Sequence, residues 1–64
     1  MSDIYTVICE WDIGQEGQFF STTSNALEFV ESAWNDLDME EEVGYSIDQA
    51  MENGLLLITD VELN

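Results

Sequence analysis

The 64-residue chain contains no lysine, arginine or histidine. An average composition has about 25 % charged residues, so about eight lysines or arginines would be expected at this length. Without them the chain has no imidazole base, no amine nucleophile and no side-chain cation to hold a phosphate or an oxyanion. The missing cations therefore argue against catalysis, and they exclude every salt bridge between side chains.

Cysteine and long apolar runs are scarce as well, and proline is absent. The single Cys9 excludes an internal disulfide and any site built from several cysteines. Its place on the expected inner face of a strand indicates a buried, unreactive thiol. The best apolar stretch, Leu55 to Ile58, is far shorter than the roughly 20 residues that cross a bilayer. No segment after Met1 resembles a removable signal, and the single cysteine indicates a reducing compartment, so we expect a cytoplasmic protein.

What the chain does contain is acid together with apolar residues. Fifteen residues are Asp or Glu, which gives a formal net charge of −15, yet 45 % of the residues are hydrophobic and seven are aromatic. High net charge favours disorder only when hydrophobicity is low. We therefore expect one folded domain, residues 1–64, whose acidic surface serves its function.

Three segments have the composition of strands. Residues Asp3 to Trp11 alternate apolar side chains onto one face, and Asp12 to Gly17 resembles a turn. Gln18 to Thr22 is then expected to return as a second strand, forming a hairpin. Leu55 to Leu63 is expected to be the last strand, lying beside the first.

Two helices are expected between these strands. The first is expected to be capped by Ser24 or Asn25 and to bury Leu27, Val30, Trp34 and Leu37. The second, Ile47 to Asn53, has a Ser46–Gln49 capping box and is closed by Gly54. The sequence thus predicts an α+β fold, β-β-α-α-β, with a small three-stranded antiparallel sheet and one longer and one short helix.

Metal binding and carboxylate catalysis are two other functions that acidic residues can serve. Asp36, Asp38 and Glu40 have the spacing of the start of an EF-hand loop, but Glu41 occupies the glycine position and Ile47 the position of the bidentate acid. Paired carboxylates carry out glycosidase chemistry, but a 64-residue chain has little room for a sugar cleft. We expect no metal, no cofactor and no enzymatic activity.

The acidic surface indicates a basic partner. A chain without cations is repelled by nucleic acids and anionic membranes, and it is attracted to proteins that bind them. From Glu28 to Asp38, four acids along a helix of about 15 Å would approach the charge spacing of a DNA strand. The candidate partner-binding residues are Glu10, Asp12, Glu16, Glu28, Glu31, Asp36, Asp38, Glu40, Glu41, Glu42 and Tyr45.

The aromatic residues are candidates for binding energy inside that surface. Trp11 and Trp34 are expected in the core. Phe20 and Phe29 lie at the margins of their apolar stripes, and Tyr45 follows the acidic run directly. An exposed aromatic anchor within a polar rim is typical of protein interfaces.

In size, in the absence of cations and in segments such as DLDMEEE (36–42), the chain resembles phage-encoded DNA-mimic inhibitors. These include anti-restriction proteins, uracil-DNA glycosylase inhibitors and several anti-CRISPR proteins. The resemblance implies competition for a basic groove, and an anti-CRISPR protein that blocks a DNA-binding subunit of a Cascade-type complex is the preferred expectation. The alternatives are an acidic module for another basic protein, such as a toxin, and a domain whose acidity serves solubility.

Overall fold

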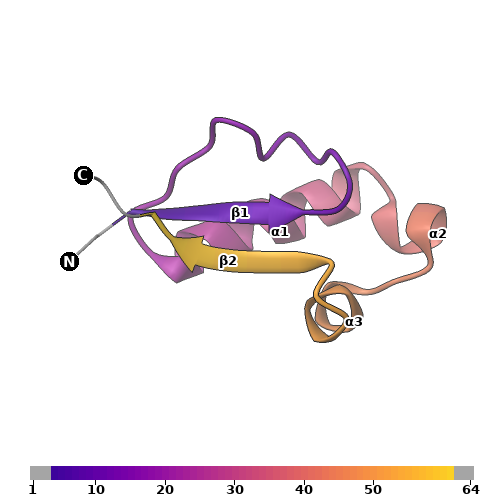
Figure 1. Ribbon diagram of the computed structural model, residues 1–64. Coiled ribbons are helices and arrows are strands. Elements are labelled where there is room, and N and C mark those ends of the chain that lie inside the picture. The colour runs from indigo at the N-terminus through magenta and orange to yellow at the C-terminus, as the bar shows by residue number, and fades with distance from the viewer. Residues whose placement is uncertain (1–3, 62–64) are drawn as a thin grey trace.

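The computed structural model describes residues 4–61, which form two strands and three helices (Figure 1). The mixed α+β class agrees with the sequence prediction, but the numbers of strands and helices do not. The elements are β1 (Tyr5–Cys9), α1 (Thr23–Asp36), α2 (Met39–Val43), α3 (Ile47–Glu52) and β2 (Leu56–Asp60).

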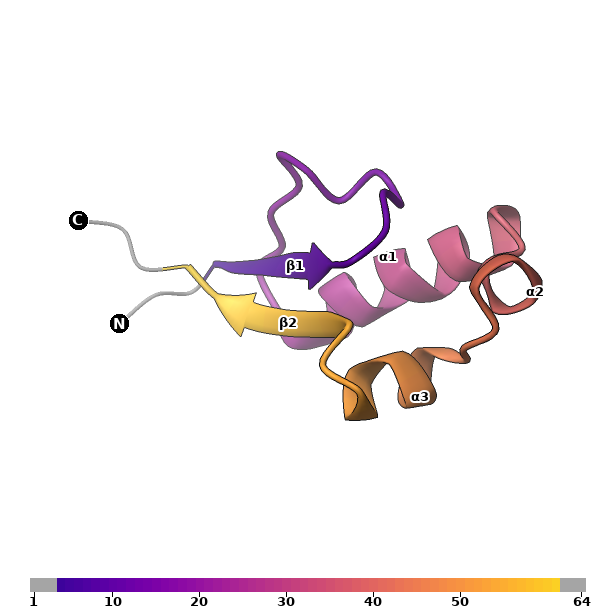
Figure 2. The same ribbon diagram turned by 45° about the vertical axis from the view of Figure 1, so that its right-hand side comes forward.

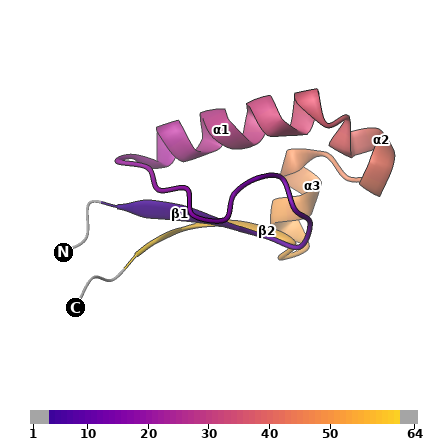
Figure 3. The ribbon, with the colours of Figure 1, turned by 90° about the horizontal axis from the view of Figure 1, so that it is seen from above.

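β1 and β2 form a two-stranded antiparallel sheet in which Val7 lies opposite Ile58 and Ile8 lies opposite Leu57. The first and last strands are therefore neighbours, as expected. Because successive side chains point to opposite faces, Val7 is buried towards α1, whereas Ile8 and Leu57 are 54 % and 52 % exposed. Figure 3 shows α1 on one side of the sheet, and none of the described helices covers the other side.

The predicted three-stranded sheet is wrong, because Gln18 to Thr22 does not form a strand. Its pairing with β1 is one bridge, in which Tyr5 N–H donates to Phe20 O over 2.7 Å and Phe20 N–H donates to Tyr5 O over 2.8 Å. Helix α1 begins at Thr23, three residues after Phe20, with Thr22 as its N-cap. The start of the helix therefore uses the residues that a longer strand would have needed.

The N-terminus of α1 is capped earlier than predicted. Thr22 is the N-cap, and its hydroxyl accepts a hydrogen bond from Asn25 N–H over 3.0 Å. Ser24 and Asn25, the predicted caps, both lie inside the helix. A hydroxyl at this position satisfies one of the amides that the first helical turn leaves unpaired.

The buried side of α1 is narrower than the sequence indicated. Ala26, Val30 and Trp34 are buried, but Leu27 is 37 % exposed and Leu37 is 48 % exposed. Leu37 is the C-cap residue, at the end of α1 that extends beyond the sheet (Figure 1). Leu27 lines a groove beside the helix. The buried stripe of α1 therefore includes the small Ala26 as well as the larger Val30 and Trp34.

The acidic run is helical, so the prediction of two helices is also wrong. The chain turns at Asp38, which has a φ of 53°, and the glutamates that follow it belong to α2. Met39 is 6 % exposed and anchors α2 to the core. Glutamate is a good helix former and is favourable near a helix N-terminus. Gly44 ends α2 with a φ of 79°, a left-handed conformation that suits glycine.

Helix α3 agrees closely with its prediction. Ser46 and Gln49 form the expected capping box, with Gln49 N–H donating to the Ser46 hydroxyl and Ser46 N–H donating to the Gln49 side chain. The helix ends at Glu52, and Gly54 follows with a φ of 74°. Its local sequence therefore specifies both ends of the helix.

The core is small and lies between the sheet and the helices. Ile13, from the loop after β1, is buried in it and holds that loop against the domain. The molecule is elongated, with extents of 38 × 21 × 17 Å (Figure 2). No helix within residues 4–61 is both long enough and apolar enough to cross a bilayer. The buried core residues are Val7, Ile13, Ala26, Val30, Trp34, Met39, Ala50 and Leu56.

Candidate protein-binding surface

Every acidic side chain that the structure describes is exposed. The sequence contains no Lys, Arg or His to pair with them, so these carboxylates are free to meet cations from outside the chain. No polar or charged residue within residues 4–61 is buried. The described acids are Glu10, Asp12, Glu16, Glu28, Glu31, Asp36, Asp38, Glu40, Glu41, Glu42, Asp48, Glu52 and Asp60.

The densest group of carboxylates lies where α1 passes into α2. We call Asp36, Asp38, Glu40, Glu41 and Glu42 the acidic end, because α2 forms one end of the elongated molecule (Figure 2). α1 extends beyond the sheet and carries α2 away from it. The acidic end is therefore presented to a partner without obstruction from the sheet.

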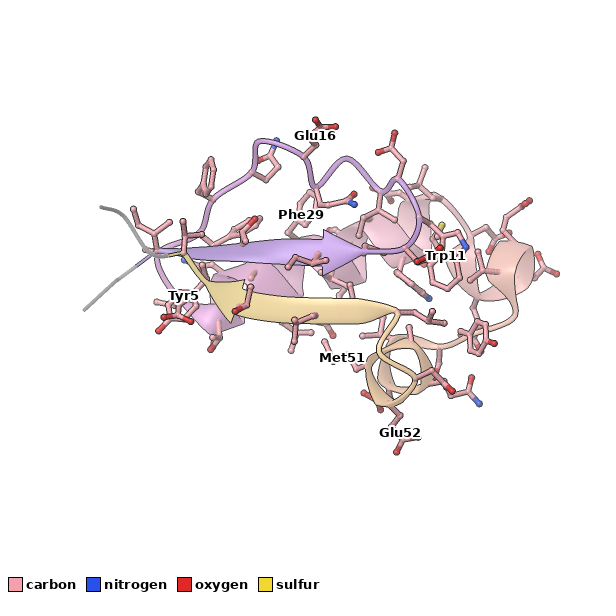
Figure 4. All side chains as sticks on the ribbon, in the orientation of Figure 1. Tyr5, Trp11, Glu16, Phe29, Met51 and Glu52 are labelled. Carbon is pink, nitrogen blue, oxygen red and sulfur yellow. The ribbon has the colours of Figure 1, made fainter. Side chains whose placement is uncertain are left out.

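An aromatic cluster ties the loop after β1 to the same end of the molecule. Trp11 packs edge-on against Trp34 at 6.0 Å between ring centroids and lies 5.9 Å from Tyr45. Figure 4 shows Trp11 beyond the end of β1, and Glu10 and Asp12 are its neighbours in the chain. These two acids therefore adjoin the residue that packs against Tyr45.

Tyr45 has a structural role that the sequence did not reveal. It is half-buried, its ring packs against Trp11, and its carbonyl oxygen accepts a hydrogen bond from Trp34 Nε1 over 3.0 Å. Phe20 and Phe29, the other candidate anchors, pack against each other at 5.4 Å. These aromatic side chains therefore make their contacts within the domain. Among residues 4–61, the large apolar side chain with the greatest exposure is instead Phe19, at 61 %.

The remaining candidate acids do not all share one face. Glu28 and Glu31 lie on α1, whereas Glu16 lies at the crest of the loop, away from α2 (Figure 4). Asp38 is not on α1 as predicted, because the helix ends at Asp36 and the chain then turns. The straight row of charges from Glu28 to Asp38 is therefore broken at its last member.

A groove of about 330 Å³ lies between α1, α2 and α3. Two of its acids, Glu31 and Glu40, were predicted from the sequence as partner-binding residues, but Asp48 was not. Leu27 and Trp34 were expected in the core, and both also line this groove. No local signal indicated this site, because it forms only when the start of α3 lies beside α1.

No group of three or more His, Cys, Asp or Glu side chains within residues 4–61 is arranged to hold a metal ion. Cys9, predicted to be buried, is a half-buried free thiol on β1.

No known protein family, curated protein or solved structure matches this chain. Function must therefore be argued from the charges, shapes and contacts of the chain itself. The resemblance to DNA-mimic inhibitors remains one of size and charge.

Substitutions of Asp38 test both the left-handed turn before α2 and the role of the acidic end in binding. Its φ of 53° is unusual for a residue other than glycine, and its side chain makes no capping hydrogen bond. We expect Asp38→Gly to stabilise the fold by about 0.5 kcal/mol, since relief of a left-handed conformation exceeds the added flexibility of glycine. Urea denaturation measures this change.

The matched control is Asp38→Asn, which removes the same charge and tolerates the same backbone conformation. Both variants are expected to weaken partner binding to a similar extent, although only Asp38→Gly gains stability. Destabilisation by Asp38→Gly would contradict the left-handed turn. Unchanged binding in both variants would remove Asp38 from the interface.

Proposed function

We propose that this protein is a DNA mimic that inhibits a basic nucleic-acid-binding protein by occupying its DNA-binding groove. The observation that carries the proposal is the exposure of all described carboxylates in a chain that has no side-chain cation. A lysine or arginine on this surface would be repelled by a groove built for phosphates. A basic groove therefore favours a binding surface whose charges are all negative.

The size of the molecule supports the same proposal. Its longest dimension is 38 Å, and one turn of duplex DNA is about 34 Å long. Within the acidic end, three consecutive glutamates follow a helix that rises about 1.5 Å per residue. Duplex DNA carries one charge per roughly 1.7 Å of axis. The acidic end thus presents charge at a density comparable with that of a duplex.

The proposed target is a defence protein in the cytoplasm of a host cell, with the DNA-binding subunit of a Cascade-type CRISPR complex as the first choice. In that setting the protein competes with the duplex that carries the protospacer-adjacent motif. It acts without a cofactor and without turnover, so its effect depends on stoichiometric occupancy.

The test is competition for DNA on a purified Cascade-type complex. Adding the protein is expected to release a labelled target duplex in a mobility-shift assay, with an apparent affinity that falls as salt rises. A uracil-DNA glycosylase and a type I restriction enzyme serve as parallel targets. Release from either of these alone would keep mimicry and replace the Cascade assignment.

A complex that holds duplex DNA and this protein together would overturn mimicry. Binding to a basic protein that has no nucleic-acid groove, such as a toxin, without release of DNA from any of the three targets, would favour the acidic interaction module instead. Each outcome is read from the same labelled duplex and from size-exclusion chromatography of the mixture.

A further inference from the structure

The groove between α1, α2 and α3 has apolar walls. Leu27 and Trp34 come from α1, and Ile47 comes from the start of α3. Trp34 is 5 % exposed and Leu27 is 37 % exposed, so the walls range from buried to open. Such a surface suits the aliphatic stem of a long side chain, because burying methylene groups there removes apolar area from water.

Three acidic residues also line the groove, and each belongs to a different helix. Glu31 lies on α1, Glu40 on α2 and Asp48 on α3. All three are exposed, and within residues 4–61 none of their side-chain carboxylates accepts a hydrogen bond. The groove is therefore lined by strong acceptors that the described chain leaves without donors.

Two other polar groups at the groove already form hydrogen bonds within the domain. Trp34 Nε1 donates to Tyr45 O over 3.0 Å, and the Ser46 hydroxyl accepts from Gln49 N–H over 3.2 Å. A ligand therefore meets apolar walls and three negative charges. This combination selects a group that is both long and cationic, and it rejects anions.

We propose that the groove receives an arginine side chain of the basic partner, an inference that rests on the proposed function. The stem lies along Leu27 and Ile47, and the guanidinium lies among the three carboxylates. Arginine fits better than lysine because its planar fork directs five N–H donors outwards, so it reaches acceptors on separate helices. It is also more weakly hydrated than an ammonium group and packs well against aromatic rings.

The probe is N-acetyl-arginine amide, titrated into the isotopically labelled protein and followed by NMR. We expect saturable shifts of the Trp34 indole N–H and of the methyl groups of Leu27 and Ile47. N-acetyl-citrulline amide has nearly the same shape without the charge and is expected to produce no such shifts. N-acetyl-lysine amide is expected to bind more weakly than the arginine compound.

Matched variants separate the groove from the overall charge. The groove variant combines Glu31→Gln, Glu40→Gln and Asp48→Asn. The control variant neutralises three exposed acids that lie outside both the groove and the acidic end. It combines Glu16→Gln, Glu52→Gln and Asp60→Asn, and both variants change the net charge from −15 to −12 because three charges are lost.

Loss of the three groove carboxylates is expected to weaken arginine binding by at least about tenfold, whereas the control variant should stay within about twofold of wild type. Equal weakening in the two variants, shifts spread over all acids, or equal binding of citrulline would overturn the proposal. Circular dichroism of both variants shows whether either has unfolded, and Leu27→Ala tests the apolar wall independently of charge.

The DNA-release assay distinguishes this inference from the function on which it rests. If both variants still release duplex from the target equally well, mimicry stands and the groove is not its arginine site. If wild-type protein binds N-acetyl-arginine amide in the groove but releases no duplex from any target, the groove is a cation site and mimicry is wrong.

Discussion

Replacing Glu40, Glu41 and Glu42 together by lysine is expected to weaken binding to the target by at least about 100-fold, because like charges brought together at an interface cost several kcal/mol. All three side chains are exposed on α2, in the acidic end. A basic groove that attracts three carboxylates repels three ammonium groups at the same positions. Isothermal titration at two salt concentrations measures the change, and the loss should shrink as salt rises.

The control carries the same charge change at scattered positions. Glu16→Lys, Glu52→Lys and Asp60→Lys also shift the net charge from −15 to −9, since each substitution adds two positive units. Glu16 and Glu52 lie on opposite margins of the molecule (Figure 4). This control is expected to lose less than about tenfold in affinity, through weaker long-range steering. If the two triple variants lose the same affinity, the interface does not include the acidic end.

The fold should survive this charge reversal. Lysines in the first turn of α2 lose a favourable interaction with the helix dipole, worth about 0.3–1 kcal/mol each. They also replace repulsion by attraction towards the acids that remain. At low salt these effects oppose each other, so we expect little change in the unfolding midpoint. A collapse of the midpoint would show that the binding loss came from unfolding.

Local chemistry explains the elements that the sequence predicted well. The Ser46–Gln49 capping box and Gly54 define α3 because both signals act within a few residues of the helix they delimit. The strand Tyr5–Cys9 follows from alternating side chains and Leu56–Asp60 from a short apolar run, and neither signal needs knowledge of the partner strand. Predictions of this kind depend on near neighbours alone.

The errors arise where two local signals compete or where distant segments meet. Gln18 to Thr22 has a strand-like composition, but Thr22 is also a good N-cap, and the helix takes precedence. The acidic run contains helix-forming glutamates, and the packing of Met39 and Val43 against the core stabilises a helix of five residues. A helix this short is marginal on its own and depends on tertiary contacts.

The candidate surface was likewise predictable from the sequence only in part. The absence of cations and the exposure of acids follow from composition, so the acidic end was identifiable from the run at 36–42. The role of Tyr45 was not, because its contacts with Trp11 and Trp34 join segments more than ten residues apart. The groove needs three helices in their final positions. Composition thus supports the proposal of a basic partner, whereas the groove proposed for its arginine is visible only in the packing.

Neighbouring leucines in β2 provide the sharpest test of the fold. Leu56 is 2 % exposed and Leu57 is 52 % exposed, so the same substitution at adjacent positions should have very different costs. We expect Leu56→Ala to destabilise the domain by about 2–5 kcal/mol and Leu57→Ala by less than about 1 kcal/mol. A domain of this length has roughly 3–10 kcal/mol in total, so the first loss is severe.

Urea denaturation of both variants gives the two costs, with equal slopes as the check that the denatured states are comparable. The pair controls for strand propensity, because both substitutions exchange leucine for alanine within β2. A one-residue shift in register would move Leu57 to the face that packs on α1 and reverse the order of the costs. Equal costs would mean that both faces of the sheet are covered. A large difference in the expected direction establishes that the face of the sheet carrying Ile8 and Leu57 is open.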